Sequence, residues 1–251
     1  MTTLAQVKQV TRPLLERNAD LALAADRLVV IKPVRHLIRG VYIGQSYDPI
    51  VHRPIWLVTF LFKPGAVPGD RWGERLVTKR GVRLTVDSPR EMFQERFRIK
   101  SAQARLPVHV RRYPESWDGW VAYDPTIATE MCEVIEEEAL PMLRALQSID
   151  DFVAFTADQT RFPWTYIGSN YFDEPFVFAA QGNFEAALAA CTRLAAEEST
   201  GPATQELLRL LAGGDRHGVA QLLHGWEAES VKRLKLEEYW EPTLFPIEAT
   251  A

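Results

Sequence analysis

The sequence predicts an α+β protein, with an antiparallel sheet of four to six strands, helices on one face of it, and then a small all-helical region. Between residues 27 and 62, apolar runs rich in β-branched residues alternate with short turns, which is typical of a meander of strands. From residue 172 onward, apolar residues recur at spacings of three and four, which is typical of helices. We therefore predict an α+β domain over residues 1–147 and a helical region over residues 148–251.

The first elements follow from apolar periodicity and turn residues. A helix is predicted over residues 3–18, where apolar side chains recur on one face, and Pro13 is expected to shorten or kink it. Short connections cannot make the crossover that parallel strands need, so the strands that follow are expected to pair antiparallel. These strands are predicted at residues 28–31, 34–43 and 55–62.

The stretch from residue 64 to 112 is expected to add strands and a short helix. Residues 75–86 have the pattern of a hairpin, and residues 107–110 that of a further strand. Ser88 begins a possible capping box with proline at the first helical position, which favours a short helix there.

The second half of the chain is predicted to be helical. Asp124 and Pro125 form a helix start, and the long helix that follows is expected to be interrupted at Pro141. Ser148 or Asp150 is expected to open the next helix. Further helices are predicted over residues 183–198 and 203–212, from Asp215, and from Trp226 to Tyr239.

Composition excludes several protein classes. The 251 residues are 47% apolar and 25% charged, with 14 Gly and 16 Pro, which is ordinary for a globular chain and unlike a disordered or collagen-like one. The longest apolar run, residues 55–62, is too short to span a bilayer, and the first residues do not resemble a secretory signal. We expect a cytoplasmic protein without a membrane partner. Cys132 and Cys191 are expected to be buried small hydrophobes.

Charge is distributed unevenly along the chain. Residues 1–112 hold 21 Lys and Arg against 9 Asp and Glu, whereas residues 113–251 hold 8 against 24. Such asymmetry points to charged partners or to pairing between the two halves. The sequence leaves both alternatives open.

The sequence contains none of the common catalytic or metal-binding motifs. The chain has no GxSxG, HExxH, phosphate-loop or GxGxxG pattern, and its five histidines are scattered, so surface or capping roles are expected for them. Glu130, Glu133 and Glu137 recur on one predicted helix face, where a solvated or partner-facing acidic stripe is expected rather than a metal site. No cofactor is predicted, and the pattern leans against an enzyme.

The basic half supplies a candidate ligand-binding set. Between Arg71 and Arg112 there are 12 Lys and Arg against 4 acids, a charge pattern that suits nucleic acid or another anionic ligand. Neutralisation within the chain or by a protein partner is the favoured alternative. The aromatic segment from residue 152 to 178 is expected to be a packed junction between sheet and helices, or else a groove beside it. The candidate ligand-binding residues are Arg96, Arg98, Arg111, Arg112, Trp164 and Tyr166.

Two family resemblances accompany these patterns. FAAQGNFEAALAACTRL, with Gly182, Phe184 and Ala187, resembles a tetratricopeptide-type repeat, and a second copy 32 positions later departs from it at Arg216 and Val219. The segments IWLVTFLF, IEEEALPMLRAL and LKLEEYWEPTLFP lie in a layout similar to bacterial domain-of-unknown-function families. That resemblance implies an α+β domain with a helical tail and transfers no functional residue.

Two functions are compatible with this sequence. The favoured hypothesis is a non-enzymatic protein-binding or adaptor protein, because no catalytic motif accompanies the charge split and the repeat-like tail. The alternative is an enzyme or small-ligand binder that acts on an anionic substrate through the basic strand region.

Overall fold

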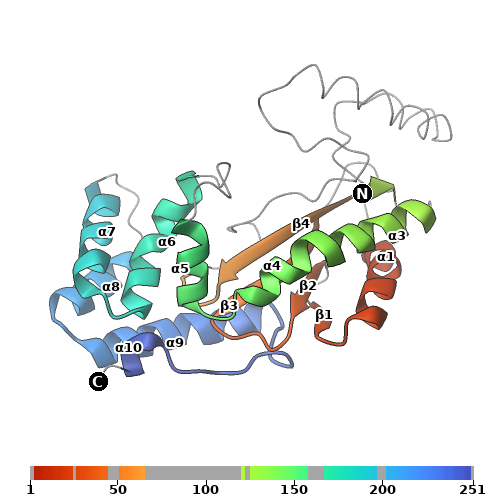
Figure 1. Ribbon diagram of the computed structural model, residues 1–251. Helices are drawn as coiled ribbons and strands as arrows, with labels where there is room; N and C mark the ends of the chain where they lie inside the picture. The colour runs from red at the N-terminus through yellow and green to blue at the C-terminus, as the bar shows by residue number, and fades with distance from the viewer. Residues whose placement is uncertain are drawn as a thin grey trace, which may run out of the picture. The chain divides into compact units, whose positions relative to one another are not determined.

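The computed structural model describes residues 3–24, 27–44, 51–65, 120–121, 125–157, 167–196 and 202–249. Within them the predicted class is confirmed, because a sheet near the N-terminus is followed by a mostly helical C-terminal region (Figure 1). The strands are β1 (Leu21–Ala24), β2 (Leu28–Ile31), β3 (Leu37–Gly44), β4 (Val51–Phe60) and β5 (Trp120–Val121). The helices are α1 (Leu4–Arg17), α3 (Pro125–Val134), α4 (Leu140–Ala145), α5 (Ile149–Ala157), α6 (Ile167–Ala180), α7 (Phe184–Ala196), α8 (Pro202–Ala212), α9 (Arg216–Arg233) and α10 (Pro246–Ala249).

The sheet is an antiparallel meander in the order β1-β2-β3-β4-β5. All four residues of β2 and seven of the eight in β3 are buried, so these strands are covered on both faces. At the edge, β4 pairs antiparallel with β5, which places Val51 opposite Val121 and His52 opposite Trp120. Strands β2, β3 and β4 are therefore antiparallel neighbours in chain order, as their short connections and β-branched residues predict.

The strands differ from the predicted ones, since β1 and β5 were not predicted and β3 and β4 have other boundaries. β1 was not predicted, because its sequence LALA contains residues that favour helices and no β-branched side chain. Burial of Leu21, Ala22 and Ala24 stabilises it at the edge of the sheet. β3 begins at Leu37 rather than at residue 34, and β4 begins and ends earlier than predicted.

Three of the predicted elements lie outside the described residues. They are the hairpin over residues 75–86, the helix from Ser88 and the strand over residues 107–110. They stay predictions.

The chain divides into two compact units. Met1–Val29, Gly40–Trp56 and Glu74–Leu143 form the first, and Val30–Arg39, Leu57–Gly73 and Arg144–Ala251 form the second. The predicted domains, residues 1–147 and 148–251, are a division by sequence position and stay a prediction.

In the first unit, α1 packs against β1 and α3. Thr3 and Gln6 form a capping box at the start of α1, in which the Gln6 N–H donates to Thr3 Oγ1 at 3.3 Å and the Thr3 N–H to Gln6 Oε1 at 2.7 Å. The helix continues through Pro13, which was expected to shorten or kink it, and ends at Arg17. Val7, Val10 and other side chains on one face of α1 are buried.

The helix that follows residue 124 was predicted to be interrupted at Pro141. The structure shows instead that the helical path continues through this residue. A π-helix, Ile135–Ala139, joins α3 to α4, and Pro141 lies within α4. Proline has no N–H, and its ring conflicts with the carbonyl four residues earlier in a regular α-helix. The Leu140 N–H bonds to the carbonyl of Ile135, one residue further back than in an α-helix. The wider turn directly before Pro141 therefore keeps the helical path continuous.

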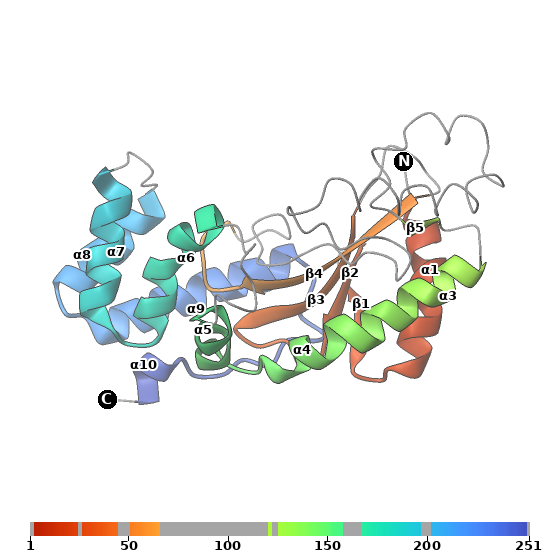
Figure 2. The ribbon, with the colours of Figure 1, turned by 45° about the horizontal axis from the view of Figure 1, so that its top comes forward.

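In the second unit, consecutive helices α6, α7, α8 and α9 pack against one another, and α6 also packs against α9 (Figure 2). α9 corrects the sequence prediction, because one 18-residue helix replaces the two that were expected from Asp215 and from Trp226. Gly225 lies inside it, exposed to solvent, where a single glycine costs a helix about 1 kcal/mol and does not break it.

The turns between α6 and α7 and between α8 and α9 have the same structure. Gly182 and Gly214, 32 positions apart, have positive φ angles of 77° and 67°, which glycine adopts without a Cβ penalty. The next residue is Asn183 in one turn and Asp215 in the other, and its side chain caps the following helix. Asn183 Oδ1 accepts from the backbone N–H of Ala186 at 3.1 Å. Asp215 Oδ1 accepts from the backbone N–H of Gly218 at 2.8 Å. The two copies noticed in the sequence are thus equivalent at their turns.

Part of the aromatic segment packs as expected. Phe152 of α5 meets Phe60 of β4 in an edge-on contact with 4.9 Å between ring centroids. Phe176 of α6 makes a similar contact with Trp226 of α9 at 5.6 Å. The interpretation as a packed junction between sheet and helices is therefore confirmed for Phe152, whereas Phe176 packs between two helices.

Candidate functional site

The candidate ligand-binding residues predicted from sequence all lie outside the described residues. The anionic-ligand site that they were expected to form therefore stays a prediction. These residues are Arg96, Arg98, Arg111, Arg112, Trp164 and Tyr166.

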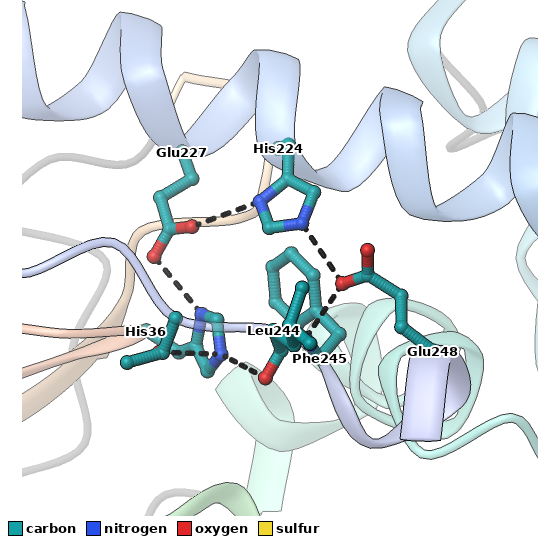
Figure 3. A network of polar contacts seen from close by, with 7 residues as sticks. His36, His224, Glu227, Leu244, Phe245 and Glu248 are labelled. Atoms are coloured by element: carbon teal, nitrogen blue, oxygen red, sulfur yellow. Dashed lines mark hydrogen bonds and ion pairs between the residues drawn. The ribbon is translucent and has the colours of Figure 1, made fainter. Parts of the chain in front are cut away.

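The second unit contains a different cluster of ionisable side chains. His36 lies between β2 and β3, His224 and Glu227 lie on α9, and Glu248 lies on α10 (Figure 3). We call these four residues the His-Glu cluster. Their side chains come from three segments that are far apart in the sequence, and Glu227 lies between the two imidazoles.

His36 and Glu227 form the buried part of the cluster. Glu227 is 0% exposed and His36 is 9% exposed. His36 Nδ1 is 3.0 Å from Glu227 Oε1, and His36 Nε2 is 3.2 Å from the carbonyl oxygen of Leu244 and 3.1 Å from Thr243 Oγ1. The Leu244 carbonyl only accepts, whereas the Thr243 hydroxyl can donate or accept, so the direction of the hydrogen bonds at His36 Nε2 follows the tautomer of the ring.

His224 links this pair to Glu248. His224 Nε2 is 2.9 Å from Glu248 Oε2, while His224 Nδ1 is 3.5 Å from Glu227 Oε2. The His224 side chain is 34% exposed, so the cluster is open to solvent on this side. Among the described residues, no hydrogen-bond partner reaches Glu227 Oε2.

Aromatic rings surround the cluster with apolar surface. Phe245 is stacked on His36, with 4.0 Å between centroids and 17° between planes, and is tilted against His224 at 4.6 Å. Phe62 meets Phe245 edge-on at 5.2 Å. Excluding water in this way strengthens each polar contact and raises the cost of any polar atom that is left unpaired.

Local sequence explains how each segment presents its residues. On α9, His224 and Glu227 are three positions apart and therefore share a face. At the start of α10, the N–H of Phe245 donates to Glu248 Oε2 at 2.7 Å, the reciprocal half of a capping box. That bond holds the Glu248 carboxylate towards His224.

A parallel bridge aligns the C-terminal segment with the segment that carries His36. The N–H of Val34 donates to the carbonyl of Tyr239, and the N–H of Glu241 donates to the carbonyl of Val34, both at 2.8 Å. Arg35 adds an ion pair with Glu241 at 3.0 Å. His36 therefore reaches Thr243 and Leu244 because the two backbones run side by side.

The cluster can share protons between its imidazoles and its carboxylates. Each nitrogen of His36 and His224 faces an oxygen of the chain, so neither imidazole presents a free nitrogen to a substrate. Across the described ranges there is no group of three or more His, Cys, Asp or Glu side chains that would hold a metal ion. The contacts tie α9, α10 and the β2–β3 connection together.

The prediction of surface or capping roles was wrong for His36, which is buried against Glu227. It holds for His217, an exposed residue of α9 whose Nε2 is 2.8 Å from Gln221 Nε2. The spacing of His224 and Glu227 on one helix was a local signal for the cluster. Its pairing with His36 had none, because 191 positions separate His36 from Glu227.

The structure partly answers how the basic and acidic halves of the chain relate. In the part of the chain that the structure describes, cations from the basic half pair with acids of the other half, each pair inside one unit. Lys63 Nζ lies 2.7 Å from Asp173 Oδ1, and both side chains are almost completely buried. The side chains of two further pairs are more exposed. The two further pairs are Arg17–Glu136 and Arg35–Glu241. Neutralisation within the chain therefore accounts for part of the charge split.

Of the three carboxylates on the predicted acidic helix face, the side chain of Glu130 lies outside the described residues. Glu133 and Glu137 face solvent, as predicted, but Glu136 of the π-helix turns towards the end of α1. There it accepts from Arg17 Nη2 at 2.7 Å and from Asn18 Nδ2 at 2.7 Å. The hydrogen bond from Arg17 to Glu136 raises the pKa of the guanidinium.

Both cysteines are free thiols and both are buried, as predicted. Burial raises the pKa of the Cys191 thiol from about 9 to about 11 and also raises that of Cys132. Cys132 Sγ donates to the carbonyl of Val10 at 3.6 Å, linking α3 to α1. Neither thiol has the depressed pKa of a nucleophile.

Comparisons of the chain with protein-family models, curated proteins and solved structures found no match. The resemblance to tetratricopeptide-type repeats therefore stays a prediction. In the part of the chain that the structure describes, no helix is both long enough and apolar enough to cross a membrane.

Proposed function

We propose that this chain is a non-enzymatic, cytoplasmic protein-binding protein, and that helices α6 to α9 carry its binding surface. The observation that supports it best is the repetition of one turn structure. Gly182 with Asn183, and Gly214 with Asp215, end one helix and cap the next in the same way. Successive helical hairpins of this kind provide extended surfaces for partners in repeat proteins.

The outer face of α7 suits such a role. Glu185, Ala189 and Thr192 are exposed at helical spacing, while α6 and α8 pack against other parts of the same helix. Small side chains let a partner helix or strand approach closely, and Glu185 provides charge at one end.

The His-Glu cluster supports a non-enzymatic role, because its imidazole nitrogens are engaged by oxygens of the chain itself. A general base needs a nitrogen within reach of the proton that it removes. The two free, buried cysteines are compatible with a reducing compartment such as the cytoplasm.

The proposal is tested by purifying the tagged full-length chain from its native lysate in mild salt and quantifying the bound proteins. Ala189→Arg places a long charged side chain on the exposed face of α7. We expect this variant to lose at least tenfold of the bound partner, because one buried, unpaired charge costs an interface several kcal/mol.

Ala5→Arg is the matched control, since Ala5 is an exposed alanine of α1 in the other unit. It should retain the partner, and both variants should keep the circular dichroism spectrum of the wild type. Recovery of no stoichiometric partner, or equal recovery with Ala189→Arg and wild type, would count against the proposal.

A further inference from the structure

All four imidazole nitrogens of the His-Glu cluster face oxygen atoms. His36 lies between Glu227 and the carbonyl of Leu244, and His224 lies between Glu227 and Glu248 (Figure 3). A neutral imidazole has one N–H and one lone pair, so it satisfies only one such oxygen. For His224, whose two nitrogens both face carboxylate oxygens, both contacts become hydrogen bonds only when the ring carries two protons.

The four contacts differ in length, and the longest is the one that depends on a second proton on His224. Three of them measure 2.9 to 3.2 Å, within the range of hydrogen bonds. The contact from His224 Nδ1 to Glu227 Oε2 measures 3.5 Å, and this oxygen is the buried one without a hydrogen-bond partner among the described residues. With N–H groups in the three short contacts only, two carboxylates are balanced by one imidazolium. A fourth proton, at His224 Nδ1, makes the cluster neutral.

Other charged groups near the cluster have partners of their own. α10 packs against α9 and α6, and His36 follows Arg35 in the chain. Arg233, further along α9, donates to Ser230 Oγ at 3.3 Å, and Arg216 at its start lies over the ring of Phe184. The remaining pairs are Lys63 with Asp173, Glu174 with Arg193, and Arg35 with Glu241.

We propose that the His-Glu cluster is a proton-controlled latch that fastens the C-terminal segment, residues 239–249, to the second unit. In the fastened state His224 carries a second proton on Nδ1 and donates it to Glu227 Oε2. Loss of that proton leaves a lone pair facing a buried carboxylate oxygen, which loosens α10 and the residues before it. This device is independent of the protein-binding role proposed above.

The direction of the pH effect follows from the proton count. The fastened segment binds one proton more tightly than the released one, so acidification favours fastening. Histidine side chains change charge between about pH 5 and 8, so the segment should be tightest in mild acid.

Hydrogen exchange measures this latch locally. The N–H of Phe245 donates to Glu248, and the N–H of Glu241 donates to Val34, so both amides are protected only while the segment is fastened. Between pH 8 and pH 6, after correction for intrinsic exchange, we expect their protection to rise roughly tenfold, as for one hydrogen bond to a charged group. The amide of Ala187, in α7, serves as an internal reference and should not change.

Two variants of the same helix separate the latch from a general effect of pH. His224→Gln keeps a side-chain N–H for Glu248 but does not titrate, so the rise in protection should disappear. His217→Gln removes an exposed histidine that contacts only Gln221 among the described residues, and it should keep the full rise.

Three results would overturn the latch. The wild type would show no rise in protection between pH 8 and pH 6, or His224→Gln would keep the rise. In case His224→Gln does not fold, the imidazole proton resonances of wild-type His224 are titrated by NMR. Their midpoint should coincide with that of the Phe245 protection, and a clear separation of the two would also contradict the proposal.

Discussion

Glu227 is a carboxylate with no solvent exposure, and its two oxygens lie beside two imidazoles. A carboxylate in such a place is stable only while it is paired, because removing one partner of a buried ion pair leaves an uncompensated charge. The aromatic stack of His36 on Phe245 keeps the imidazole fixed opposite Glu227. At this scale the cluster adds side-chain contacts to the backbone bridge that holds the C-terminal segment.

Replacing Glu227 by glutamine keeps the shape of the side chain but removes its charge. We expect Glu227→Gln to lower the free energy of unfolding by about 1.5–3 kcal/mol, which is typical of a lost hydrogen bond to a charged group. Urea denaturation at neutral pH measures this change.

Glu229→Gln is the matched control, because Glu229 is exposed on the same helix and its replacement should change stability by less than about 0.5 kcal/mol. Equal effects of the two substitutions would show that Glu227 contributes no more than a surface residue.

At the scale of elements, a positive-φ glycine and a capping Asn or Asp form both turns of the helical region. The two copies differ at the next helical residue, which is Phe184 in the first and Arg216 in the second. The guanidinium of Arg216 lies over the ring of Phe184, with 5.6 Å from Cζ to the ring centroid. The residue that departs from the repeat pattern thus contacts its counterpart in the other copy.

The two glycines should differ in their tolerance of alanine. Gly214→Ala is expected to cost about 1 kcal/mol from the left-handed conformation alone, because nothing lies within 4 Å of the added Cβ. Gly182→Ala should cost roughly 0.5–1 kcal/mol more, since its Cβ would lie 2.9 Å from Arg216 Nη2 and displace that side chain from Phe184.

Urea denaturation of both variants gives this difference, and a repeat in an Arg216→Ala background should reduce it. A larger cost for Gly214→Ala than for Gly182→Ala would contradict the packing that the structure shows at this turn.

For the molecule as a whole, the buried thiols make the free energy of unfolding depend on pH in the alkaline range. Burial raises the pKa of Cys191 from about 9 to about 11. The thiol of the unfolded chain therefore loses its proton at lower pH than that of the folded chain. Because the folded state binds more protons in this window, its stability should fall as the pH rises from about 9 to about 11.

Unfolding free energies of the wild type and of Cys191→Ala, measured in urea over this pH range with a reducing agent, test the expectation. The wild type should lose stability more steeply than the variant. Cys132 and Tyr239, whose pKa values are also raised by burial, remain in both proteins and contribute the same slope to each. Parallel curves would show that Cys191 does not contribute.

The sequence by itself determined the fold class, because local periodicity and turn chemistry act within a few residues. The strand β2 and the helix α1 follow from the apolar periodicity of neighbouring residues. It did not predict β1, whose LALA segment becomes a strand only because the sheet buries it. Nor did it predict the π-helix that carries the chain past Pro141.

Only the tertiary structure decided the His-Glu cluster. His36 meets Glu227 because the segment after β2 pairs with residue 240 and so lies beside the C-terminal segment. No local pattern encodes a contact over that sequence distance, since it depends on the path of the backbone between the two residues. The same holds for the ion pairs between Lys63 and Asp173 and between Arg17 and Glu136, which join the basic half of the chain to the acidic half.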